Sequence, residues 1–164
     1  MKDRIARMLA EAKARRHDAA ILGASLSTRS DSQAFLRVLA FEVLLKAAVL
    51  ASGQARAGGH DYKDLWNKLP VTARNEVLDV AKNRMPGHAE LADLHRLLSW
   101  YKFIFEKARY GYELHDGLTP AQVARKGDAW EARGAPIEEA EIQYYPLELE
   151  CLTEGLIAYV EREL

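Results

Sequence analysis

The sequence predicts an all-α protein: an antiparallel bundle of four main helices with short accessory helices. Three observations predict it. Apolar residues recur three and four positions apart along most of the chain, strand-like alternation is nearly absent, and most segments are rich in residues that favour helices. The length of 164 residues fits one domain with its own core, which we place at 1–164 with an insertion at about 118–146.

The composition narrows the functional classes. Net charge is -1, so the overall charge does not indicate nucleic-acid binding, and contact with RNA would need a local basic patch. Cys151 is the single cysteine, which permits no internal disulfide and agrees with a reducing, cytoplasmic location. No CxxC or HExxH motif is present, and we expect neither a metal nor another cofactor.

The first two helices are predicted at about Asp3 to Leu22 and about Ser32 to Ser52. The first has a basic outer face, expected to be solvated, although RNA or an acidic partner could bind it; its inward stripe consists of Ile5, Met8, Leu9 and Ala12. The second is apolar nearly all round, which suits a central helix. Arg37, Glu42 and Lys46 interrupt it, so a membrane span is not expected. The predicted caps are Ser30 or Asp31 before it and Gly53 after it.

Two short helices come next. "HDYKDLWNKLP" predicts one that stops at Pro70, and Thr72 is expected to cap "ARNEVLDVAKNR", which "MPG" ends.

A long helix is predicted from about His88 to Tyr112. Seven residues alternate three and four apart and are expected on one inward seam: Leu91, Leu94, Leu98, Tyr101, Phe105, Ala108 and Tyr112.

The chain after "HDG" predicts a short helix and then an irregular stretch. Thr119 is the expected cap of this helix, with Pro120 in its first position. A structureless loop of this length would be unusual in a compact domain, so the insertion is interpreted as a partner-binding segment. "LELECLTEGLIAYVEREL" predicts the closing helix, with an inward face of Leu149, Leu152, Leu156 and Tyr159 or Val160.

Three stretches together resemble the HEPN superfamily (higher eukaryote and prokaryote nucleotide-binding domains), in particular its small bacterial members. They are "FEVLLKAAVLASG", "GHDYKDLWNKL" and "WYKFIFEKARYGYELH", and they cover roughly residues 30 to 115. Many HEPN proteins are metal-independent endoribonucleases with an Arg and a His a few residues apart; here five residues separate Arg109 from His115. The resemblance implies a homodimer with a shared RNA-cleaving cleft, and a role in a toxin–antitoxin pair, phage defence or RNA processing, with an antitoxin or defence-complex protein as a possible partner.

The chemistry suits these residue types. RNA can be cut by its own 2′-hydroxyl, a histidine can move the proton, and an arginine can hold the phosphate. In a regular helix, however, six positions leave Arg109 and His115 about 120° apart and about 9 Å along the axis. The hypothesis therefore requires a broken helix, for which Gly111 is a plausible site. In the alternative, Arg109 pairs with Glu113 and His115 is a solvated helix-end residue.

Other residues are expected to support the site. Glu42 and Lys46 form an intrahelical pair, or Glu42 orients Arg109. His60 and Asp61 cap the short helix, or line the cleft.

We expect the two tyrosines between Arg109 and His115 to pack in different ways. Tyr112 is expected to pack on the seam, and Tyr110 to pack in a dimer or to stack on a base.

The alternative to a nuclease is a non-catalytic interaction or nucleotide-sensing module with the insertion as its working surface.

Overall fold

The computed structural model describes residues 1–25 and 31–164; at Ala108, Arg109 and Gly111 it describes the backbone only. The predicted all-α bundle is confirmed, because every regular element in the described ranges is a helix. In chain order these are α1 (Lys2–Ser25), α2 (Asp31–Ala51), α3 (Tyr62–Lys68), α4 (Val71–Arg84), α5 (Leu94–Lys107), the 3-10 helix η1 (Ala108–His115), α6 (Pro120–Ala132), the 3-10 turn η2 (Ile137–Glu139) and α7 (Pro146–Glu163).

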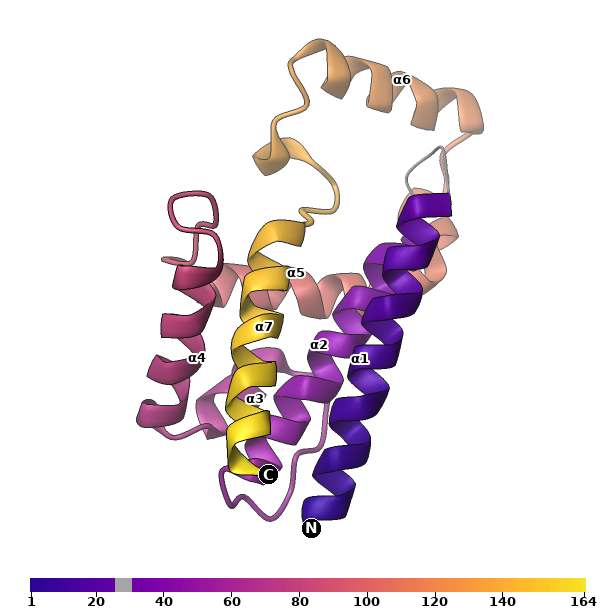
Figure 1. Cartoon of the computed structure of the whole chain (residues 1–164). Helices are drawn as coiled ribbons and strands as arrows, with labels where there is room; N and C mark the ends of the chain where they lie inside the picture. Colours follow the sequence, from indigo (N-terminus) through magenta and orange to yellow (C-terminus); the bar gives the residue numbers. More distant parts are fainter. Residues whose placement is uncertain (26–30) are drawn as a thin grey trace.

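Four helices lie side by side in the order α1, α2, α7 and α4 (Figure 1). The pairs α1/α2 and α4/α7 run antiparallel, whereas the neighbours α2 and α7 run in the same direction (Figure 1). Helix α5 crosses this layer and packs on α2 and α3. The stretch predicted as the second short helix forms α4 and takes the fourth place in this layer, whereas the predicted long helix forms α5, which crosses it.

Helix α2 is the centre of the fold, as its all-round apolar sequence predicts. Ten of its residues are buried, from Val38 to Leu50. Its end is also as predicted: Gly53 has a left-handed φ of 88°, and the N–H of the next residue bonds back to the carbonyl of Val49. The predicted N-cap Ser30 lies outside the described residues, and Asp31 is the first residue of the helix.

Helices α4 and α7 approach closely at Gly155. A Cβ atom built on Gly155 would lie 2.3 Å from the carbonyl oxygen of Val77. The inward face predicted for α7 is confirmed, because Leu149, Leu152, Leu156, Tyr159 and Val160 are all buried. Cys151 is buried on the same helix, and burial raises the pKa of its thiol, as suits a core residue rather than a nucleophile.

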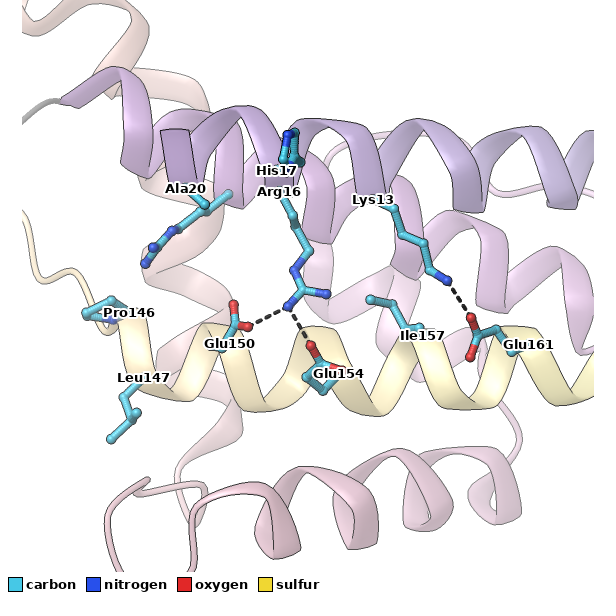
Figure 2. Close-up of a pocket in the computed structure, with 11 residues that line it drawn as sticks. Lys13, Arg16, His17, Ala20, Pro146, Leu147, Glu150, Glu154, Ile157 and Glu161 are labelled. Atoms are coloured by element: carbon cyan, nitrogen blue, oxygen red, sulfur yellow. Dashed lines mark hydrogen bonds and ion pairs between the residues drawn. The ribbon is translucent and has the colours of Figure 1, made fainter. Parts of the chain in front are cut away.

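Charged side chains connect α1 to α7 across a groove of about 770 Å³. Arg16 donates hydrogen bonds to both Glu150 and Glu154, and Lys13 pairs with Glu161 (Figure 2). Part of the basic face of α1 is therefore neutralised by α7 rather than left to solvent. The inward stripe of α1 is confirmed: Ile5, Leu9 and Ala12 are buried and Met8 packs against the core.

The long helix is shorter than predicted at both ends. It begins at Leu94, because the side chain of Asp93 accepts the N–H of Arg96 and starts the helix there. It ends at Lys107, and η1 follows. Tyr112 was predicted on the inward seam, but it is 71% exposed, because the change of helix type turns it away from the core.

The predicted cap Thr72 is also wrong. Helix α4 starts directly after Pro70, whose carbonyl accepts the N–H of Arg74, so Thr72 lies inside the first turn and makes no cap. Within the described part of the chain, no helix is long and apolar enough to cross a membrane.

The insertion forms an arm that projects from the bundle (Figure 1). Thr119 caps α6 and Pro120 is in its first turn, as predicted; Gln122 completes a capping box with Thr119. None of the residues of α6 is buried. The side chain of Trp130 ties the helix to the following turn by donating to the carbonyl of Pro136 at 2.9 Å.

Candidate functional site

A buried carboxylate, Glu42, lies where α2, α3 and α5 meet. It is 4% exposed. Lys46 Nζ donates to it at 2.7 Å, Tyr62 Oη donates at 2.8 Å, and His60 Nδ1 lies 3.0 and 3.1 Å from its two oxygens. Burial alone would raise the pKa of Glu42, but the hydrogen bonds from Lys46, His60 and Tyr62 outweigh it and place this pKa below the ordinary value. The group is therefore an ionised carboxylate inside the fold.

The predicted Glu42–Lys46 pair is confirmed, with the charges one helical turn apart. The alternative in which Glu42 orients Arg109 depends on a side chain that is outside the described part. Tyr62 and His60 hold the carboxylate in the structure.

Asp61 caps α3 as predicted. Its side chain accepts the N–H of Asp64 at 3.1 Å and the ammonium of Lys102 on α5 at 3.0 Å. The N–H of Asp64, followed by the bond from Lys102, lowers the pKa of Asp61. His60 precedes this cap and stacks on Phe105, with ring centroids 4.9 Å apart and planes at 21°. His60 and Asp61 of the "GHD" turn thus contact both α2 and α5.

The helix break that the nuclease hypothesis requires is present. Regular α-helix ends at Lys107, and within η1 the backbone of Tyr110 is non-helical, with φ -130° and ψ 51°. This break lies between Arg109 and His115 in the chain. Tyr110 is 45% exposed and its ring meets that of Tyr112 edge-on at 6.3 Å, so both rings stand at the surface of η1. Glu113 is exposed on the same segment.

His115 faces the arm rather than open solvent. It lines a pocket of about 540 Å³ whose other walls come from α6 and the chain around η2, including Lys126, Trp130 and Ile142. His115 Nδ1 is buried and lies 3.6 Å from a carboxylate oxygen of Glu141, beyond hydrogen-bond distance. Glu141 also binds Lys126 at 3.2 Å. The alternative describes His115 as a solvated helix-end residue; in the structure its side chain is 37% exposed, and the insertion covers part of it.

The structure thus describes two groups of the predicted residues. Glu42, Lys46, His60 and Asp61 gather at the junction of α2, α3 and α5, and His115 lies on η1 against the arm. The pairing of Arg109 with Glu113 lies outside the described side chains.

Sequence reasoning missed four participants: Tyr62, Lys102, Phe105 and Glu141. Only Tyr62 carried a usable signal, because a tyrosine at an inward helix position needs a partner for its hydroxyl.

The remaining histidines are exposed: His17, His88 and His95. Among the described residues, no group of three His, Cys, Asp or Glu side chains is arranged to hold a metal ion. In the groove between α1 and α7, Lys13 and Arg16 are already paired with glutamates of α7, so these two cations are not available to a ligand (Figure 2).

Comparison with known proteins gives no relative: no family model matches the chain, no curated protein matches its sequence, and no solved structure matches its fold.

Proposed function

We propose that this chain is a metal-independent endoribonuclease of the HEPN type that acts as a homodimer, in a toxin–antitoxin or phage-defence context. Arg109 holds the scissile phosphate and His115 transfers a proton. The observation that carries the proposal is the backbone break at Tyr110, because an unbroken helix would keep the two motif residues on different faces.

Two further observations support the proposal. His115 is 37% exposed and lines a pocket, so part of its imidazole ring is accessible to a ligand. The buried cluster around Glu42 also fixes α3 and α5 relative to α2, which holds the end of α5, and thus the start of η1, in place.

Cleavage would proceed without an added nucleophile. The 2′-hydroxyl of the RNA attacks the adjacent phosphorus, and the 5′-oxygen leaves. An imidazole supplies or removes a proton near neutral pH, and a guanidinium offsets the charge on the phosphorane. The homodimer would bring two copies of each group to one cleft, and the exposed rings of Tyr110 and Tyr112 would lie in or near the contact.

The test is RNA cleavage in the presence of a chelator. We expect wild-type protein to cleave, and Arg109→Ala and His115→Ala to lose the activity while keeping the wild-type helical circular dichroism. Arg84→Ala and His95→Ala are matched controls, since both residues are exposed and outside the site. Undiminished cleavage by both motif variants would remove the proposed roles. Sedimentation of the wild type as a monomer at assay concentrations would remove the composite site.

The arm favours a second candidate, a non-catalytic nucleotide-sensing module. Its pocket combines the ring of Trp130 and the apolar Ile142 with charged rims, a usual composition for a ligand site. In this case the wild type would not cleave RNA, and adding ATP or GTP would change the fluorescence of wild-type protein but not that of Trp130→Phe.

A further inference from the structure

The histidine with the most complete proton-transfer geometry is His60, outside the Arg–His motif. Its Nδ1 lies 3.0 Å from one oxygen of Glu42 and 3.1 Å from the other. Its side chain is nevertheless 54% exposed, against 5% for that of Glu42. Among the described residues, Nε2 of His60 has no hydrogen-bond partner. The ring is therefore bound to Glu42 through Nδ1, while Nε2 is available for another contact.

Glu42 fixes which nitrogen is available. An ionised carboxylate only accepts hydrogen bonds, so the proton of the ring belongs on Nδ1 and the lone pair on Nε2. Lys46 already balances the charge of Glu42 at 2.7 Å, and Tyr62 holds its second oxygen at 2.8 Å. Both oxygens of Glu42 therefore have donors besides His60, and with its proton on Nδ1 the His60 ring keeps Nε2 as its acceptor atom.

The ring is also fixed in orientation. His60 stacks on Phe105 at 4.9 Å, and Phe105 in turn stacks on Phe35 at 5.9 Å. Phe105 is in the last turn of α5, directly before η1. The ring of His60 therefore lies beside the last turn of α5, after which the segment with Arg109 and His115 begins.

We propose that His60 is a second proton-transfer group of this site and that Glu42 is its positioning residue. The inference rests on the proposed endoribonuclease function and assigns its base. Nε2 of His60 takes the proton of the 2′-hydroxyl while the 2′-oxygen bonds to phosphorus. The bond from phosphorus to the 5′-oxygen breaks, and that oxygen takes a proton from His115. The products are a 2′,3′-cyclic phosphate and a 5′-hydroxyl end, with no change of oxidation state.

The substitution His60→Asn distinguishes a proton-transfer role of His60 from a structural one. The side-chain amide that His60→Asn introduces can donate to Glu42 from nearly the position of Nδ1, but it has no nitrogen equivalent to Nε2 that could accept a proton. His60→Ala removes both functions. His88→Asn is the matched control, since His88 is exposed in a turn outside the site.

The decisive measurement is RNA cleavage by His60→Asn, together with thermal melting and binding of an uncleavable RNA with 2′-deoxy sugars. We expect cleavage to fall by about 10²- to 10⁴-fold, the usual contribution of a general base, with melting and binding close to wild type. His88→Asn should cleave at the wild-type rate.

The outcomes separate this inference from the proposed function. Wild-type cleavage by His60→Asn overturns the role of His60 and leaves the endoribonuclease standing. No cleavage by wild-type protein overturns both. Nitrogen NMR of the folded protein gives a readout without RNA: the proton of the neutral His60 ring should be on Nδ1, and finding it on Nε2 overturns the inference.

Discussion

The hydroxyl of Tyr62 donates a 2.8 Å hydrogen bond to Glu42, and the two residues are 0% and 4% exposed. Glu42 is thus a buried charge whose two oxygens receive donors from α2 and from the start of α3. Burying a carboxylate is costly unless its hydrogen bonds are complete. The stability of this junction therefore depends on each donor.

Tyr62→Phe tests that dependence. The variant keeps the packing of the ring but removes the hydrogen bond that Tyr62 donates to the buried carboxylate of Glu42. We expect the free energy of unfolding in urea to fall by about 1–3 kcal/mol. Thr72→Val is the control, because it removes the hydroxyl of an exposed residue that makes no cap, and it should change stability by less than about 0.5 kcal/mol. Equal losses in the two variants would contradict the account of the junction.

Glu42 also predicts how stability depends on pH. Its pKa in the folded protein lies below the ordinary value of 4.5. The ionised group therefore contributes stability that is fully present above about pH 4.5 and is lost as the pH falls through the folded pKa.

In Glu42→Gln this contribution is absent. The free energy of unfolding, measured between about pH 6 and pH 3, should therefore fall less steeply than in the wild type. Parallel curves would show that Glu42 is not the group responsible.

Local sequence signals predicted most of the helices but not the contacts of the site. Gly53, Asp61 and Thr119 fix helix ends through their own neighbours, and the structure has these ends as predicted. The contacts of Glu42 with His60 and Tyr62 join residues 18 and 20 positions apart, so no local pattern could give them. The prediction for Tyr112 was wrong for a different reason. Its spacing of three and four positions continues the apolar seam, but the α-helix ends at Lys107, before Tyr112 is reached.

Gly155 is required where α4 and α7 meet. In Gly155→Ala the new methyl would lie 2.3 Å from the carbonyl oxygen of Val77, and backbone cannot rotate away as a side chain can. We expect a loss of about 1–3 kcal/mol in urea unfolding, as for other overpacked cores.

Gly127→Ala is the matched substitution. Gly127 is also inside a helix, but nothing lies within 4 Å of a Cβ atom built there. It should be neutral, or stabilise by up to about 1 kcal/mol through helix propensity. A loss at Gly127 as large as that at Gly155 would show that the close contact is not the cause.

Arg16 should contribute more to stability than Lys13, although both connect α1 to α7. The side chain of Arg16 is 22% exposed and binds two carboxylates, whereas the Lys13–Glu161 pair is 47% and 48% exposed. We expect Arg16→Ala to cost about 1–2 kcal/mol and Lys13→Ala about 0–1 kcal/mol. Raising the salt concentration should reduce the effect of Lys13→Ala more. A larger loss for Lys13→Ala would contradict this ranking.

Helix α6 should open independently of the bundle. It buries none of its residues, so the capping box of Thr119 and Gln122 and the bond from Trp130 to Pro136 are its main local supports. Segments with few buried contacts exchange their amide hydrogens through local opening at low free energy. We expect amide exchange in 120–132 to be faster than in α2 or α7, and Thr119→Ala to speed it further by about fivefold, which corresponds to a cap of about 1 kcal/mol.

Because α2 does not depend on this cap, its amide exchange should stay unchanged in Thr119→Ala. Equal acceleration in both helices would show that the arm and the bundle unfold as one unit.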